Sequence, residues 1–112
     1  MSDQKALQRL EEEHYERLRQ HKKAEEELEN YFYQFKSQTK DLMEQIYYDY
    51  RHFPIQEARP FLAELEENLS AYQRDYDNNR SRIEEVRQKE KREFNKKVED
   101  LENRYRETRD ND

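Results

Sequence analysis

The chain has 112 residues with neither glycine nor cysteine, and its 28 acidic and 22 basic side chains leave a net charge of −6. The lack of glycine excludes phosphate-binding loops and dinucleotide-binding motifs, because both need backbone that approaches the ligand closely. The lack of cysteine excludes disulfides, thiolate metal sites and cysteine nucleophiles, and no apolar run approaches the ~20 residues that a membrane span needs.

The N-terminal half of the chain carries one long helical stripe. Half of all residues are Ala, Glu, Lys, Leu or Arg, which is typical of long helices when the periodicity is helical. On a helical wheel the stripe holds one face from Leu7 to about Tyr50 and includes His14 and His21. We therefore predict a first helix over about residues 3–50, with Ser2 and Asp3 as candidates for the N-cap.

The aromatic segment after this helix predicts the chain reversal, at about residues 49–57. Pro54 disfavours helix at Phe53 and suits a first helical position itself. Pro60 leaves two alternatives: a single turn over residues 55–58 precedes the second helix, or Pro60 lies within the first turns of that helix and kinks them. With no glycine to adopt positive φ, we expect a broad, packed turn.

A second stripe predicts a helix over about residues 58–108, and the whole chain, 1–112, is predicted to be a single all-α domain. We expect an antiparallel two-helix hairpin, coiled-coil-like, in which facing residue numbers sum to about 108. The acidic block at residues 11–29, with a net charge of −4, then faces the basic block at 79–97, with a net charge of +4. The predicted facing pairs include Phe35 with Tyr72, Phe32 with Tyr76, His14 with Phe94, Leu10 with Val98, Ile46 with Leu62, and Leu42 with Leu65 and Leu69.

The closed half of this hairpin has more apolar surface than one helix–helix seam can bury. Eleven of the fourteen aromatic residues lie between Tyr31 and Tyr76. These side chains either thicken the hairpin's own core or dock a further helix, and we favour docking because aromatic and methionine side chains are enriched at interfaces. The candidate partner-binding residues are Tyr31, Phe32, Phe35, Met43, Tyr47, Tyr50, Phe53 and Phe61.

No catalytic, cofactor-binding or metal-binding constellation is expected. Glu11 and His14 have the Glu-x-x-His spacing of di-iron bundles, but those sites need a second such pair, and the predicted second helix has no histidine. The two seam histidines are better explained as filling a polar stretch, with the alternative that their protonation at mildly acidic pH loosens the open end. Ser37, Ser70 and Ser81 have no histidine nearby in sequence, so no nucleophile is expected either.

The basic residues of segment 80–97 raise the question of nucleic-acid binding. The negative net charge and the glutamates that interrupt the segment argue against it. A helix lying on a membrane surface would need a strong apolar face beside its basic residues, and this segment has too little apolar surface. We therefore expect a cytoplasmic protein, exported at most together with a client, and neither membrane insertion nor nucleic-acid binding.

In format the chain resembles the small WXG-type helical hairpins of bacterial type VII secretion. It departs from them in its turn, Tyr47 to Pro54, which has no Trp or Gly, and in lacking the Tyr-x-x-x-Asp/Glu export signal, since Arg109 follows Tyr105 by four residues. It is more similar to the second small, Glu/Arg-rich targeting factor that accompanies LXG-domain toxins. That resemblance rests on length, charge pattern and the aromatic turn over the whole chain.

The resemblance implies a helical adaptor or targeting chaperone that binds the helical N-terminal domain of an LXG toxin, alone or with another small helical hairpin protein, and helps deliver it to the secretion machine. The sequence also leaves open a self-associating protein that forms a dimeric four-helix bundle. A nucleic-acid accessory protein that uses residues 80–97 is the least favoured reading.

Overall fold

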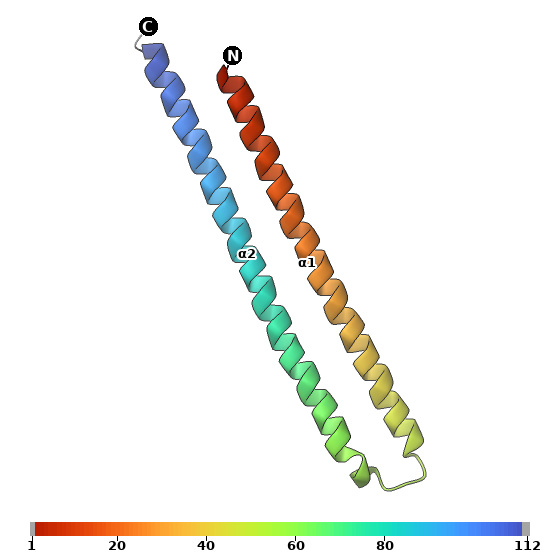
Figure 1. The fold of residues 1–112 in the computed structure, drawn as a ribbon. Helices are drawn as coiled ribbons and strands as arrows, with labels where there is room; N and C mark the ends of the chain where they lie inside the picture. Colours follow the sequence, from red (N-terminus) through yellow and green to blue (C-terminus); the bar gives the residue numbers. More distant parts are fainter. Residues whose placement is uncertain (1, 111–112) are drawn as a thin grey trace. The chain divides into compact units, whose positions relative to one another are not determined.

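A computed structural model describes the backbone of residues 2–110 and the side chains of residues 4–109. Helix α1 spans Ser2–Asp49, the short 3-10 helix η1 spans Ile55–Glu57, and helix α2 spans Arg59–Asp110 (Figure 1). The predicted all-α, two-helix hairpin is confirmed, and both long helices begin and end within two residues of the predicted bounds. The N-cap roles suggested for Ser2 and Asp3 lie outside the described side chains.

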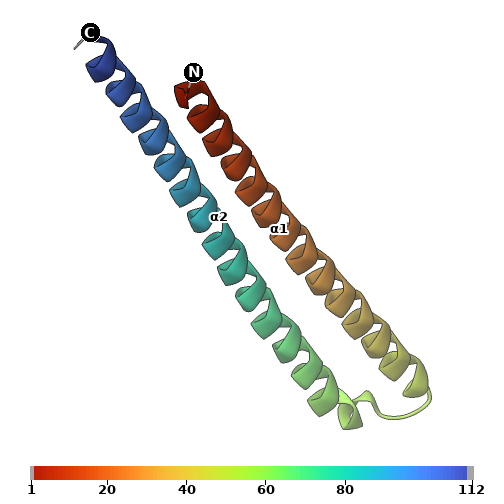
Figure 2. The same cartoon turned by 45° about the horizontal axis from the view of Figure 1, so that its top comes forward.

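The chain divides into two compact units, which we treat separately. The terminal unit contains residues 1–24 and 82–112, and the turn unit contains Glu25–Ser81. Within each unit α1 and α2 lie side by side and run in opposite directions, as both Figure 1 and Figure 2 show. The expectation that residues 1–112 form one domain stays a prediction.

The chain reverses between Tyr50 and Ala58 through short hydrogen-bonded turns. The backbone N–H of Phe53 donates to the carbonyl of Tyr50 at 3.0 Å, and that of Ala58 donates to the carbonyl of Ile55 at 2.9 Å. Pro54 between them is extended, with φ −62° and ψ 118°. No residue in the described part of the chain has a positive φ, and the reversal is broad, as expected of a glycine-free chain. It is not packed as predicted, because residues 51–54 are exposed, with Phe53 at 65%.

Pro60 is the second residue of α2, within its first turn. The first four N–H groups of a helix have no intrahelical acceptor, so the missing N–H of proline removes nothing there. Helix η1 precedes it as a separate turn, which is the first of the two predicted alternatives. Regular α-helical bonding begins at Leu62, whose N–H donates to the carbonyl of Ala58 at 3.0 Å.

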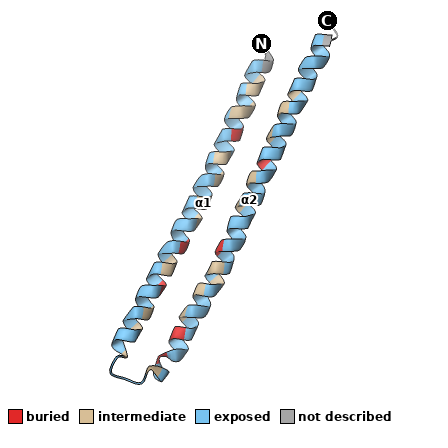
Figure 3. Ribbon diagram, turned by 180° about the vertical axis from the view of Figure 1, so that it is seen from behind, coloured by how far each residue is buried: buried red, intermediate tan, exposed pale blue. Residues whose placement is uncertain are grey.

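Stacked aromatic rings form the seam of the turn unit. The ring of Phe32 stacks on that of Tyr76 with centroids 4.5 Å apart, and Phe35 stacks on Tyr72 at 4.3 Å. Both pairs are those predicted from the register. Phe32 and Tyr76 are buried, as are Ala58 and Leu62 near the start of α2, while most of both helices is exposed (Figure 3).

The seam of the terminal unit contains charged side chains in addition to one stacked ring pair. His14 stacks on Phe94, with centroids 4.0 Å apart and planes 9° from parallel, which confirms a third predicted pair. The Nδ1 atom of His14 lies 3.3 Å from Oε1 of Glu90, and both side chains are buried. Arg17 donates to the same carboxylate oxygen at 3.2 Å, so the expected polar stretch of the seam is a cross-helix ion-pair cluster.

Truncation of Phe32 tests the seam of the turn unit. Phe32→Ala should lower the free energy of unfolding by about 3 kcal/mol, because it empties the stacked site of a ring that is only 3% exposed. Urea unfolding followed by circular dichroism measures the change. The matched control is Tyr31→Ala, the preceding residue on the same helix and 67% exposed, which should change stability by no more than about 0.5 kcal/mol. Equal losses in the two variants would refute the stacked seam.

Candidate functional site

An apolar groove in the turn unit is the best candidate for a functional site. It has a volume of about 430 Å³. Five of its lining residues are apolar or aromatic, and two are polar. We refer to it as the turn-unit groove, lined by Leu42, Ile46, Tyr50, Phe61, Glu64, Leu65 and Asn68.

The groove follows from helical spacing on both of its walls. Leu42 and Ile46 are four residues apart on α1, and Tyr50 follows at the same spacing just after the helix ends, with its N–H donating to the Ile46 carbonyl at 3.0 Å. Phe61 and Leu65 have the same spacing on α2. Since two helices make a single line of contact, the outer parts of these side chains stay uncovered: Leu42 is 49% exposed and Phe61 is 59% exposed.

Three further aromatic side chains are exposed around the chain reversal. Tyr47, Tyr48 and Phe53 are each more than half exposed. The guanidinium group of Arg51 lies 3.9 Å from the centroid of the Tyr48 ring, and it also donates to the Tyr48 carbonyl at 3.0 Å.

The structure distributes the eight predicted partner-binding residues over three environments. Tyr50 and Phe61 line the turn-unit groove. Phe32 and Phe35 stack in the seam, where Phe32 has almost no free surface. The other four lie outside the groove lining: Tyr31, Tyr47 and Phe53 are exposed, and Met43 is half-buried. Their role in partner binding stays a prediction.

The sequence predicts Leu42, Ile46 and Leu65 as seam residues, and in the structure all three line the groove. The predicted pairing of Leu42 with Leu65 brings these residues to one place, and they do line one groove. Periodicity alone cannot tell a seam residue from one at the edge of the seam, because both fall on the same broad stripe. Glu64 and Asn68 were missed for a different reason, since polar side chains at a groove edge carry no periodic signal of their own.

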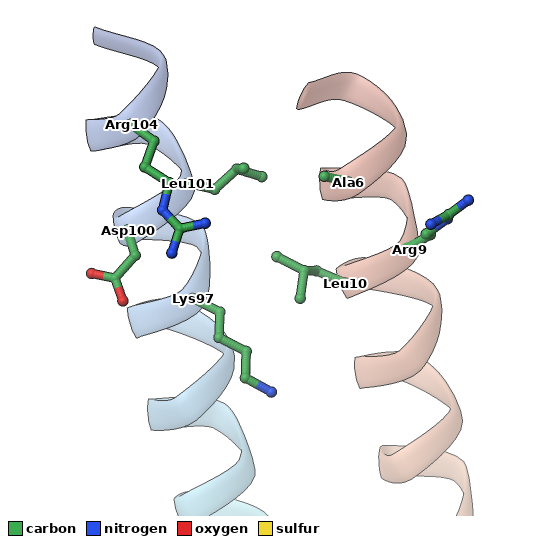
Figure 4. Close-up of a pocket in the computed structure, with 7 residues that line it drawn as sticks. All are labelled: Ala6, Arg9, Leu10, Lys97, Asp100, Leu101 and Arg104. Carbon is green, nitrogen blue, oxygen red and sulfur yellow. The ribbon is translucent and has the colours of Figure 1, made fainter. Parts of the chain in front are cut away.

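A second hollow, in the terminal unit, has a volume of about 380 Å³. Leu10 and Leu101 point toward one another from the two helices, with charged side chains around them (Figure 4). These are Arg9, Lys97, Asp100 and Arg104. The apolar lining residues are Ala6, Leu10 and Leu101, and the lining includes one carboxylate, Asp100, and no histidine.

The ion-pair cluster of the terminal unit centres on the carboxylate of Glu90. Burial alone would raise the pKa of Glu90, but hydrogen bonds and charge from His14 and Arg17 outweigh it and hold the pKa below its usual value. The cluster therefore contains a stable carboxylate rather than a proton donor. Among the described side chains no three His, Asp or Glu residues are grouped so as to hold a metal ion.

His14 and His21, the two histidines of the pH hypothesis, have different surroundings in the structure. Protonated His14 would place its charge beside the Glu90 carboxylate, which favours the paired arrangement. His21 differs, because its Nδ1 atom is buried without a hydrogen-bond partner. Loosening at mildly acidic pH stays a prediction.

Two basic residues of segment 80–97 form ion pairs with neighbouring acids on the same helix. Arg87 pairs with Glu84 at 3.0 Å, and Lys89 lies 3.9 Å from Glu93. Exposed pairs of this kind contribute about 0–1 kcal/mol each. They nevertheless place negative charge between the bases, which weakens the segment as a surface for phosphates.

Comparison with protein-family models, curated proteins and solved structures finds no match to this chain. In the described part of the chain, neither long helix has a segment that is apolar enough to cross a membrane.

Acid unfolding tests the ion-pair cluster. The pKa of Glu90 is lower in the folded chain than its ordinary value of 4.5, so its stabilising contribution is complete above that value and disappears as the pH falls through the folded pKa. The difference in unfolding free energy between the wild type and Glu90→Gln should therefore be large at pH 7 and should shrink below about pH 4.5. Chemical unfolding at a series of pH values measures it.

The control for this measurement is Glu85→Gln, which changes an exposed glutamate on the same helix. It should show a small difference at every pH. A difference for Glu90→Gln that stays constant from pH 7 to pH 3 would contradict the ion-pair assignment.

Proposed function

We propose that this chain is a non-enzymatic helical adaptor that binds a helical segment of another protein in the turn-unit groove. The single observation that carries the proposal is the groove itself, whose apolar walls stay half-exposed on a chain with very few buried apolar residues. Covering apolar surface is favourable by roughly 25 cal/mol for each Å² removed from water.

The geometry of the groove favours a helix as the occupant. Its two walls are helices that run in opposite directions within the turn unit, and each presents side chains at a spacing of four residues. A third helix can insert its own apolar stripe between such walls, which is how helix-in-groove recognition works. Tyr50 and Phe61 supply aromatic contacts of the kind that dominate binding energy at interfaces.

The proposed adaptor is non-enzymatic, because the groove lining supplies no hydrogen-bonded pair of catalytic groups. The polar groups of the lining are the Glu64 carboxylate, the Asn68 amide and the Tyr50 hydroxyl. General acid–base or nucleophilic catalysis needs at least two groups within hydrogen-bonding distance of each other and of a substrate. The groove supplies binding surface and no such pair.

The finer proposal is that the client is the helical N-terminal domain of an LXG toxin and that the adaptor helps deliver it to a type VII secretion system. This proposal is supported by the chain's resemblance in format to the second targeting factor of such toxins. Covering the groove would complete a helical bundle and shield apolar surface on both proteins. The adaptor would act in the cytoplasm and either remain there or leave with its client.

Co-expression with an LXG N-terminal domain tests the proposal. The pair Leu42→Asp and Phe61→Asp should abolish co-purification, because it buries carboxylates in the apolar contact. The matched control is Val86→Asp with Tyr105→Asp, which alters two side chains that are each 50% exposed in the terminal unit. This control should retain the client, and circular dichroism should show the same helicity in both double variants.

Light scattering on the purified chain separates the adaptor from a self-associating protein. A monomer at micromolar concentration that gains stability when the client is present supports the adaptor. A stable dimer that dissociates in the Leu42→Asp, Phe61→Asp variant would instead assign the groove to a second copy of this chain.

A further inference from the structure

The turn-unit groove lies in a strongly acidic part of the chain. The turn unit contains thirteen acidic and six basic residues, a net charge of −7, whereas the terminal unit has a net charge of +1. The segment that contributes the groove, residues 41–68, has seven acidic residues and two basic ones. Glu64 is the one charged residue among those that line the groove.

Helical periodicity places acids, and not bases, on the groove side of α1. Asp49 follows Ile46 by three residues and so shares its side of the helix. At 100° per residue, Asp49 lies about 20° around α1 from Leu42, whereas Lys36 and Lys40 lie about 120° and 160° from it, away from the groove side.

The two bases within residues 41–68 are also directed elsewhere. Arg59 precedes Phe61 by two residues on α2, which is about 200° around the helix. The guanidinium group of Arg51 lies over the ring of Tyr48 and donates to its carbonyl. Neither arginine therefore offsets the charge of Glu64 and Asp49 at the groove.

This charge distribution decides against a second copy of the chain as the occupant. A symmetric dimer through the groove would bring two acidic rims together, because each copy presents the same patch to the other. Repulsion between like charges at an interface selects against that partner. A helix with basic residues beside its apolar stripe would gain attraction instead.

We propose that the occupant of the turn-unit groove is a basic amphipathic helix, with apolar side chains between α1 and α2 and with Lys or Arg facing Glu64 and Asp49. The proposal rests on the adaptor function and specifies the chemistry of the partner. The groove wall from Leu42 to Tyr50 is about 12 Å long at 1.5 Å per residue. It therefore accommodates about two turns of the partner, with apolar side chains at positions i, i+3 or i+4, and i+7.

Two synthetic peptides test the charge requirement. Both have 18 residues and the same leucine stripe at helical spacing, and their polar faces consist of lysine in one and glutamate in the other. Fluorescence anisotropy with the full chain should show at least tenfold tighter binding of the lysine peptide at low salt. The ratio should fall in 0.5 M salt, because salt screens exposed charges.

Charge reversal at the groove supplies the matched variants. Asp49→Lys with Glu64→Lys should reduce the affinity for the lysine peptide about tenfold and increase that for the glutamate peptide. The control, Glu44→Lys with Glu66→Lys, makes the same change in net charge at exposed positions two residues from Leu42 and Glu64, about 200° around each helix. It should leave the preference for the lysine peptide in place.

Three outcomes would overturn the inference. If both peptides bind equally and Leu42→Asp weakens both, the groove docks helices without a charge requirement, and the adaptor proposal stands alone. If groove and control variants change the preference equally, only the net charge of the chain matters. If neither peptide binds, the groove as a helix-docking surface is refuted as well.

Discussion

The constraint on which the structure depends is that two helices share one line of contact. Within each unit α1 has only α2 to pack against, so each helix can bury a narrow stripe and must leave its flanks in water. Four apolar side chains are buried among the described residues: Phe32, Ala58, Leu62 and Tyr76. The charged residues that dominate the composition are a consequence, because most positions on both helices face solvent.

The two units use the single seam in different ways. In the turn unit, flat rings stacked 4.3–4.5 Å apart supply large contact area along a narrow line. In the terminal unit, His14 stacks on Phe94 and shares Glu90 with Arg17. Such a buried ion pair contributes modestly to net stability, but it penalises any register that leaves Glu90 without its partners. Stacked rings therefore stabilise the turn unit, whereas the cluster around Glu90 favours one register of the two helices in the terminal unit.

The same constraint leaves the edge of the seam as the proposed binding surface, because two packed helices cannot cover the flanks of their own contact. At this edge Leu42 and Phe61 are only half covered and Glu64 lines the groove, and helical spacing puts Asp49 on the same side of α1 as Leu42. A third helix would cover this edge as it would in a three-helix bundle. The proposed adaptor is thus a helix pair whose missing neighbour is supplied by a client.

The sequence by itself determined the two helices, the place of the reversal and the register, because a stripe with a period of 3.6 residues and a proline-flanked aromatic segment are local signals. Three ring pairs, Phe32 with Tyr76, Phe35 with Tyr72 and His14 with Phe94, lie as the register predicts. Only the tertiary structure decided which residues of the stripe are covered. Phe32 lies inside the seam and Leu42 at its edge, although both fall on one broad stripe, because exposure depends on where the partner helix lies. For the same reason, the acidic side of the groove follows only from the positions of both helices and not from the periodicity of either one.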